Sequence, residues 1–221
     1  MRLTIFAATG GIGRCLLTQA VAAGHHVTAV VRNPTKLSTA VPVVVADLAV
    51  EDPATLAPAV EGADAVLSGL GPRATADRDI ASRGTRAIVA ALRATNTRRL
   101  VVVSAAPIGT VASPGRPAPP RHDPGDGFVM RHLLAPPLKA AFRRPYADLA
   151  LMEDLVRDSG LDWTVARPPR LTDGPLTASY RTAYGRNVRR GLRVSRADVA
   201  HLMLAVLDRP ESIGQTVGVA S

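Results

Sequence analysis

The stretch that decides the fold lies near the start of the chain and reads Leu3-Thr4-Ile5-Phe6-Ala7-Ala8-Thr9-Gly10-Gly11-Ile12-Gly13. Residues 2–8 form an apolar run that predicts a buried strand, and residues 12–23 have the pattern of a helix that ends at Gly24. A turn of this kind leaves backbone N–H groups accessible at the helix N-terminus, where phosphates bind. Gly10 permits close approach of a phosphate, and Gly13 lets the helix pack tightly on the strand. The turn therefore predicts a pyrophosphate-binding loop.

Strands and helices alternate along the rest of the chain. We predict further strands at residues 27–31, 41–46, 63–67, 100–103, 163–166 and 215–221. Further helices are predicted at residues 77–94, 146–159 and 198–207. Because the strands are continuous runs of Val, Ile and Leu, they are typical of a parallel sheet that helices cover on both faces. The sequence thus predicts one α/β domain over residues 1–221, with a doubly wound, Rossmann-like sheet.

A proline-rich segment at residues 107–145 interrupts this alternation. It holds nine of the chain's 18 prolines, and each proline removes a backbone donor and fixes φ. The segment follows the fifth predicted strand, at the sheet edge where doubly wound folds bind their ligands. Two interpretations remain open, namely a lid over a substrate pocket and a disordered surface insertion.

The composition limits the class of protein. Hydrophobic residues make up 47% of the chain, which suffices for a core built mainly from Val, Leu, Ile and Ala. Cys15 is the only cysteine, so we expect no internal disulfide, and no histidine spacing is typical of a metal site. We find no signal-peptide pattern and no apolar run of about 18 residues. We therefore predict a cytoplasmic protein without a bound metal or a membrane span.

The chain is strongly basic, with a net charge of +9. Of its 27 basic residues, only Lys36 and Lys139 are lysines. This charge favours an anionic ligand, or it belongs to a solvated arginine-rich surface. The arginines are scattered and do not form one stripe, and we find no nucleic-acid recognition motif, so no nucleic-acid partner is expected.

The residue at the end of the second predicted strand indicates the cofactor. An acidic residue there binds the ribose 2′-hydroxyl of NAD, whereas Arg32 offers a planar set of donors that suits the 2′-phosphate of NADP. We therefore predict NADP(H). Asp47 follows the third strand and either meets the adenine amino group or caps the next turn. Gly69 and Gly71 follow the fourth strand and either pass beside the cofactor or form a plain turn. The predicted cofactor-binding residues are Ala7, Thr9, Gly10, Gly11, Ile12, Gly13, Arg32, Asp47, Leu48, Gly69, Leu70, Gly71 and Ser104.

Four sets of residues give the chain a resemblance to a known family. They are the loop at residues 7–13, Val101-Val102-Val103-Ser104-Ala105, residues 167–171 with 173–177, and residues 194–200. On these residues the chain resembles the atypical short-chain dehydrogenase/reductases, which include biliverdin reductase B (flavin reductase) and NmrA-like NADP-binding proteins. The resemblance covers nearly the whole chain except the insertion. These proteins usually have glycine at the position of Ala7, so alanine there requires a negative φ.

The usual proton donor of short-chain dehydrogenases is absent. Their mechanism uses Tyr-x-x-x-Lys, but the residue four positions after Tyr146 is Ala150. Tyr146 is therefore expected to pack against its helix or cap it. The acidic residues of the same helix are expected on its exposed face; these are Asp148, Glu153 and Asp154.

Ser104 and Arg170 remain as catalytic candidates. Ser104 ends the fifth strand, where its hydroxyl would face the nicotinamide, or would bond to the backbone instead. Arg170 follows the sixth strand and would hold an anionic substrate, or would form a structural ion pair. Biliverdin reductase B has a histidine at the position of Arg170, which argues against the same substrate.

Several functions fit this set of residues. The first is an NADPH-dependent reductase that transfers hydride to a small conjugated or aromatic acceptor of the flavin, quinone or tetrapyrrole type, with solvent supplying the proton. The second is a non-catalytic NmrA-like regulator that senses NADP(H) and acts through a partner protein. A third is a biosynthetic tailoring enzyme on the same fold. The chain is shorter than typical NmrA-like regulators, which favours the enzyme.

Overall fold

An eight-stranded sheet forms the centre of the computed structural model, which describes residues 1–49, 52–71, 79–127, 137 and 141–221. The strand order is β3-β2-β1-β4-β5-β6-β10-β8. The strands are β1 (Arg2–Phe6), β2 (His26–Val31), β3 (Val43–Val45), β4 (Ala65–Ser68), β5 (Arg99–Val103), β6 (Asp162–Arg167), β8 (Arg181–Tyr184) and β10 (Gln215–Ala220). Neighbouring strands are parallel except for the antiparallel pair β10–β8. The predicted single α/β domain with a Rossmann-like sheet is confirmed.

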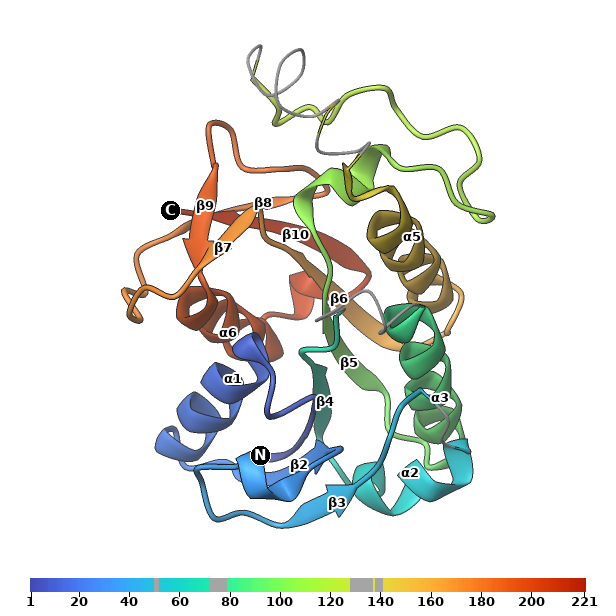
Figure 1. Ribbon diagram of the computed structural model, residues 1–221, viewed down its shortest axis with the longest axis vertical. Coiled ribbons are helices and arrows are strands. Elements are labelled where there is room, and N and C mark those ends of the chain that lie inside the picture. The colour runs from blue at the N-terminus through green and yellow to red at the C-terminus, as the bar shows by residue number, and fades with distance from the viewer. Residues whose placement is uncertain (50–51, 72–78, 128–136, 138–140) are drawn as a thin grey trace.

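Helices cover both faces of the sheet (Figure 1). They are α1 (Gly11–Ala22), α2 (Pro53–Val60), α3 (Ile80–Ala94), α5 (Arg143–Arg157) and α6 (Arg196–Ala205). α1 and α6 pack together on one face, and α3 packs against α2 and α5 on the other. None of the helices in the described part of the chain has the length and apolar character needed to span a bilayer.

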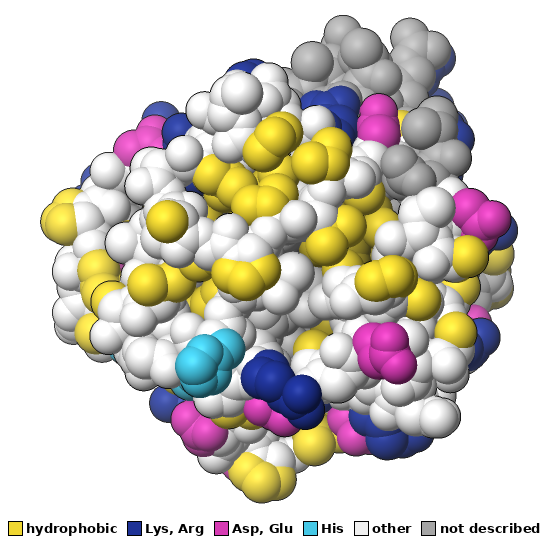
Figure 2. Space-filling model, turned by 90° about the horizontal axis from the view of Figure 1, so that it is seen from below, with side chains coloured by type: hydrophobic (Ala, Val, Ile, Leu, Met, Phe, Trp, Pro, Cys, Tyr) yellow, Lys and Arg dark blue, Asp and Glu magenta, His cyan; other side chains and the backbone are white. Residues whose placement is uncertain are grey.

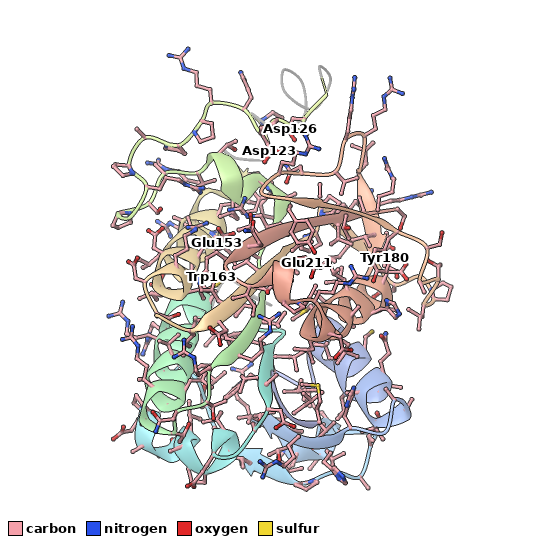
Figure 3. The ribbon with its side chains drawn as sticks, turned by 180° about the vertical axis from the view of Figure 1, so that it is seen from behind. Asp123, Asp126, Glu153, Trp163, Tyr180 and Glu211 are labelled. Carbon is pink, nitrogen blue, oxygen red and sulfur yellow. The ribbon has the colours of Figure 1, made fainter. Side chains whose placement is uncertain are left out.

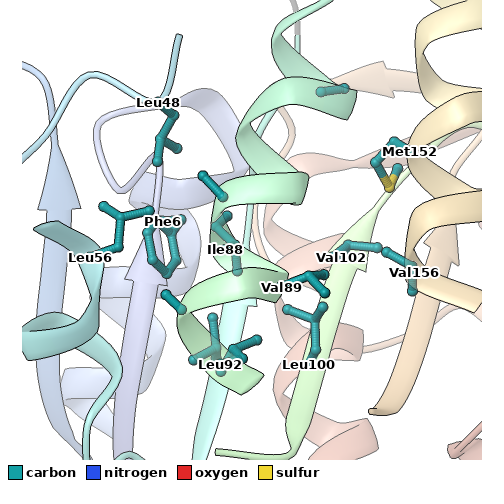
Figure 4. Packing of buried hydrophobic residues seen from close by; sticks show 14 of the residues in the cluster. Phe6, Leu48, Leu56, Ile88, Val89, Leu92, Leu100, Val102, Met152 and Val156 are labelled. Atoms are coloured by element: carbon teal, nitrogen blue, oxygen red, sulfur yellow. The ribbon is translucent and has the colours of Figure 1, made fainter. Parts of the chain in front are cut away.

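The first strand shows how the apolar runs become a core with two halves. Leu3 and Ile5 point into the cluster under α1 and α6, and Phe6 points into the cluster under α2, α3 and α5. Because side chains alternate between the two faces of a strand and helices cover both faces, all four residues from Leu3 to Phe6 are buried. Figure 4 shows Phe6 in its cluster with Leu56 and Ile88, which come from the covering helices.

Several short elements were not predicted. α2 begins after Asp52, whose Oδ1 accepts a hydrogen bond from the Ala54 N–H at 3.0 Å. A separate parallel pair joins β7 (Arg170–Thr172) to β9 (Arg193–Ser195). These strands and β8 are only three or four residues long and contain exposed arginines, so they lack the apolar run that identifies a buried strand.

The insertion is described only in part. Its beginning folds into the 3-10 helix η2 (Ala106–Thr110), followed by a bridge between Ser113 and Arg116. α5 begins at Arg143, within the insertion as predicted and before the expected helix start. Residues 128–136 and 138–140 lie outside the described part, as do residues 77 and 78 at the start of the helix predicted at 77–94.

The expectation of an exposed acidic face on α5 is wrong. The exposed fractions of Asp148, Glu153 and Asp154 are 6%, 0% and 7%. Each carboxylate has partners that are distant in the sequence, which a helical pattern cannot reveal. Asp148 accepts hydrogen bonds from the Ala81 and Ser82 N–H groups, both at 2.9 Å, and so caps the N-terminus of α3.

We expect Asp148→Ala to lower the free energy of unfolding by about 2–3 kcal/mol, because two buried N–H groups lose a charged acceptor. Urea denaturation of the variant and the parent measures the difference. Asp158→Ala is the matched control, since Asp158 is an exposed residue at the C-terminal end of the same helix and should change stability by less than about 0.5 kcal/mol. Equal losses in the two variants would contradict the capping role.

Candidate functional site

The glycine turn joins β1 to α1 in a form suited to an anion. Gly10 is the N-cap of α1, and its N–H donates to the Ala7 carbonyl at 2.7 Å. Among the described residues, no side chain caps α1, and its first turn contains no acidic residue. The first N–H groups of the helix, at Gly11, Ile12 and Gly13, are thus not used by a cap and lie at the positive end of the helix dipole. This arrangement fits a pyrophosphate.

Close backbone packing fixes the turn against its neighbours. A Cβ atom on Gly13 would lie 2.1 Å from the Ala7 carbonyl oxygen, and one on Gly69 would lie 3.0 Å from the Gly13 nitrogen. Contacts that short exclude a side chain at Gly13 and leave little room for one at Gly69. The ends of β1 and β4 and the start of α1 therefore meet through backbone atoms.

Ala7 has a left-handed backbone conformation, with φ at +55°. The expectation of a negative φ at this position is therefore wrong. The glycine that is usual at this position of the family suits this conformation better than alanine, because the alanine Cβ approaches the following carbonyl oxygen at positive φ. The loop keeps its shape here at the cost of local strain.

A pocket lies beside this turn at the carboxyl ends of the parallel strands. Its lining consists of Ala7, Thr9, Val30, Val31, Arg32, Ala46, Asp47, Leu48, Gly69, Leu70, Gly71 and Ile80. The structure thus brings together the predicted residues that follow β1, β2, β3 and β4. The start of α1 holds four more of them, namely Gly10, Gly11, Ile12 and Gly13. Ser104 does not line the pocket; it follows β5, the strand next to β4.

Apolar residues form one wall of this pocket, and sequence reasoning missed part of it. Ile80 comes from the first turn of α3 and lines the pocket. A Cβ atom on Gly84 would lie 2.4 Å from Leu70 Cδ2 and 3.2 Å from Leu48 Cβ. Gly84 therefore lets α3 approach Leu48 and Leu70. A glycine inside a helical pattern was the one available sign of this close contact.

The two polar residues at the strand ends differ in their surroundings. Arg32 is exposed and lines the pocket. Asp47 also lines it, and Asp47 Oδ1 accepts a hydrogen bond from the Ala49 N–H at 3.1 Å. Asp47 thus forms the predicted turn and still borders the space in which a ligand would lie.

Ser104 belongs to a buried network of charged side chains. Its hydroxyl donates to Glu153 Oε1 at 2.7 Å, and Arg167 Nε donates to the same oxygen at 2.9 Å. Glu153 Oε2 accepts from Arg167 Nη2 and Arg157 Nη2, both at 2.5 Å. Figure 3 shows Glu153 inside the molecule, on the helix α5. The Ser104 side chain therefore binds a carboxylate, whereas the sequence left the backbone and the nicotinamide as its alternatives.

The same network sets the charge of Glu153. Burial alone would raise the pKa of this carboxyl group. Three neighbours outweigh this effect and hold the pKa of Glu153 below its usual range. Arg167 acts through its hydrogen bonds and charge, Arg157 through its charge, and Ser104 through the hydrogen bond of its hydroxyl. Glu153 is therefore a carboxylate at neutral pH and accepts a hydrogen bond from the Ser104 hydroxyl. The lone pairs of the hydroxyl oxygen are left for a ligand.

Arg170 and Tyr146 lie apart from this network. Arg170 is exposed at the start of β7 and pairs in register with Arg193 of β9. Tyr146 is half-buried, packs against the hydrophobic core and has its ring centroid 5.7 Å from that of Phe142. Burial raises the pKa of Tyr146. The packing role expected for Tyr146 agrees with these contacts.

Arg196, which sequence reasoning missed, lies against the cofactor loop. A Cβ atom on Gly11 would lie 2.7 Å from both Cδ and Nε of Arg196. Arg196 Nη1 also contacts Asp173 Oδ1 at 2.6 Å, so the motif at residues 194–200 binds the one at 173–177. Within the residues that the structure describes, no group of three His, Cys, Asp or Glu side chains could hold a metal ion.

Comparison with known proteins gives the family. The sequence model of the NAD(P)H-binding family matches residues 7–210. The chain belongs to this family. The predicted membership of an NAD(P)H-binding family is thereby confirmed.

Solved structures share the fold over the whole chain. The anaerobilin reductase ChuY from Escherichia coli O157:H7 is 22% identical, with a TM-score of 0.76 over 100% of this chain and 97% of that one. A short-chain dehydrogenase/reductase from Veillonella parvula in complex with NADP is 20% identical, with a TM-score of 0.76 over 100% and 94%. A candidate NADH-flavin reductase from Streptococcus pneumoniae is 24% identical, with a TM-score of 0.75 over 100% and 99%.

We expect Ala7→Gly to raise the free energy of unfolding by about 0.5–1 kcal/mol, because glycine removes the cost of the left-handed conformation at this position. NADPH affinity should stay within about twofold, since the loop keeps its shape. Chemical denaturation and calorimetry measure the two effects. Ala8→Gly is the matched control and should destabilise the protein, because Ala8 is fully buried and has no positive φ. An Ala7→Gly variant that is less stable than the parent would contradict backbone strain at Ala7.

Proposed function

We propose that the protein is an NADPH-dependent reductase that transfers hydride to a small conjugated or aromatic acceptor. The observation that carries the cofactor choice is Arg32 on the lining of the pocket, at the end of β2. A guanidinium group recognises a phosphate through charge-assisted, paired hydrogen bonds. An NAD-selective site would have an acidic residue there.

The remaining pocket residues fit the other parts of the cofactor. The N–H groups at the start of α1 would bind the pyrophosphate, and Gly10 and Gly13 keep side chains away from it. Leu48, Leu70 and Ile80 offer an apolar surface for the adenine. NADPH, when bound, supplies the hydride.

The proposed chemistry does not need a protein acid. Tyr146 has no lysine four residues later, and arginine does not donate its proton at neutral pH. An electron-poor acceptor such as a flavin, a quinone or a linear tetrapyrrole accepts hydride and then takes its proton from solvent. Ser104, held by Glu153, would accept a hydrogen bond from a donor on the nicotinamide or the acceptor. The reductases among the structural neighbours support an acceptor of this type.

The first part of the insertion, residues 107–127, would border the acceptor site. Asp154 on α5 accepts hydrogen bonds from Ser113 Oγ at 3.0 Å and from the Gly115 N–H at 2.9 Å. Asp154 neighbours Glu153, which binds Ser104, and Arg157 contacts both carboxylates. These contacts support a lid whose first part is held beside Ser104.

We expect the parent protein to bind NADPH more tightly than NADH, and Arg32→Ala to remove most of the preference. The lost contact with the 2′-phosphate corresponds to about 1.5–3 kcal/mol, or roughly tenfold to a hundredfold in Kd. Calorimetry with both cofactors measures it. Lys36→Ala is the control, because Lys36 is a nearby exposed cation that does not line the pocket. Equal affinity of the parent for NADPH and NADH would refute the assignment.

Turnover is tested by following NADPH absorbance with flavins, quinones and biliverdin as acceptors. We expect Ser104→Ala to lower kcat/KM about tenfold and Tyr146→Phe to change it by less than about twofold. Thermal unfolding of both variants separates this loss from a loss of structure. A collapse of activity in Tyr146→Phe, with Ser104→Ala near normal, would mean that Tyr146 is the proton donor. Tight NADPH binding without turnover of any acceptor would favour a cofactor-sensing regulator.

A further inference from the structure

A second hollow lies between the insertion and the end of the chain, away from the pocket at β1–β4. One side comes from residues 124–127 of the insertion, and the other from β8 and the segment that follows it. We call it the arginine hollow. Its lining residues are Pro124, Gly125, Asp126, Gly127, Arg181, Thr182, Ala183, Arg186, Asn187, Val188 and Arg189.

Hydrogen bonds that two aspartates accept hold the two sides together. Asp123 Oδ1 accepts from the Gly125 N–H and the Asn187 N–H, both at 2.8 Å. Asn187 Nδ2 donates to Asp126 Oδ1 at 3.1 Å. A Cβ atom on Gly125 would lie 1.9 Å from the Asn187 carbonyl oxygen, so the two backbones are in direct contact. Figure 3 shows Asp123 and Asp126 close together at the insertion end of the molecule.

The hollow is strongly basic. Arg181, Arg186 and Arg189 line it, and within the described residues none of them forms an ion pair with a carboxylate. Asp126 is the acidic lining residue, and its Oδ1 is engaged by Asn187. Arg181 Nη1 donates to the Arg189 carbonyl at 2.9 Å, which fixes one guanidinium relative to the other segment.

The surrounding sequence adds to this charge. Residues 174–197 contain no Asp or Glu and include the arginines at 181, 186, 189, 190, 193 and 196. On the face seen in Figure 2, in contrast, basic side chains lie singly among acidic and apolar ones. Residues 174–197 therefore add positive charge around the hollow without adding a carboxylate.

The hollow lies near the same sheet edge as Ser104. Arg181 pairs with Ala220 at the carboxyl end of β10, and the order β5-β6-β10-β8 places β8 three strand spacings, or about 14 Å, from β5. The two regions are also linked through Gly109, since a Cβ atom there would lie 3.0 Å from both Asp123 Oδ2 and Arg167 Nη1. Arg167 in turn binds Glu153, the partner of Ser104.

We propose that the arginine hollow binds an anionic group, a phosphate or a carboxylate, at the far end of an acceptor whose conjugated part is reduced beside Ser104. Three guanidinium groups without acidic partners form a site that a phosphate or carboxylate completes, because arginine pairs with both through two parallel hydrogen bonds. Because β5 and β8 lie about 14 Å apart in the sheet, an acceptor that reaches both Ser104 and the hollow is elongated. This inference rests on the proposed reductase function and narrows its acceptors to anionic ones.

Equilibrium dialysis at low salt tests the hollow without turnover. The probes are FMN and riboflavin, which differ in a phosphate, and biliverdin and its dimethyl ester, which differ in two carboxylates. We expect the parent to bind at least one anionic probe about tenfold or more tightly than its neutral counterpart. Which pair shows the difference distinguishes a phosphate from a carboxylate.

Variants connect that preference to the hollow. Arg186→Gln/Arg189→Gln should weaken binding of the preferred anionic probe about tenfold and leave its neutral counterpart unchanged. Arg186→Lys/Arg189→Lys should keep part of the preference, since it keeps the charge but loses the paired hydrogen bonds. Arg86→Gln/Arg209→Gln removes the same charge from exposed positions on α3 and after α6 and should have little effect.

The outcomes separate this inference from the reductase function. Equal binding of both members of each pair, no binding of any probe, or equal losses in the hollow and control variants would overturn the anion site. Preferential binding that depends on Arg186 and Arg189, combined with no NADPH oxidation by any acceptor, would keep the anion site and refute the reductase. Turnover with riboflavin or quinones, combined with no preference for the anionic probes, would keep the reductase function and refute the anion site.

Discussion

The contact between Gly13 and the Ala7 carbonyl oxygen is the constraint on which the site depends. A Cβ atom on Gly13 would clash with the Ala7 carbonyl oxygen, because the first turn of α1 lies directly on the end of β1. This contact orients the helix so that Leu16 and Leu17 enter the core, while the N-terminus of the helix faces the carboxyl edge of the sheet. Gly69 extends the same contact to β4. The strain at Ala7 is tolerated because its neighbours fix the loop on several sides.

A second constraint joins one helix to the ends of two strands on the other side of the site. Glu153 is fully buried, and a buried carboxylate is stable only when its oxygens are paired. The partners are Arg167 at the end of β6, Arg157 of α5 and Ser104, which directly follows β5. The end of β5, where the hydroxyl lies, is therefore fixed by charges that come from β6 and α5. Such an ion pair contributes more to the placement of Ser104 than to net stability.

The sequence was sufficient for the features that depend on local patterns. The parallel strands are continuous apolar runs, and the glycine turn stands between a strand and a helix, so both could be predicted. Residues that gather at strand ends, such as Arg32 and Asp47, followed from the topology of parallel sheets. The buried acids, the arginine hollow and the contact of Arg196 with Gly11 depend on partners far apart in the chain. No periodicity records such pairs, and the short strands β7, β8 and β9 lack an apolar run.

The cap that Asp148 places on α3 has a consequence for how the domain acquires its structure. The first half of the sheet and α3 precede Asp148 in the chain, yet the N–H groups of Ala81 and Ser82 obtain their acceptor only from α5. Until α5 has docked, the N-terminal turn of α3 is incomplete, and Ile80 at that turn is also part of the pocket wall. Assembly of the cofactor pocket is therefore coupled to the arrival of the second half of the chain. The domain gains cooperativity in folding from one carboxylate that bridges its two halves.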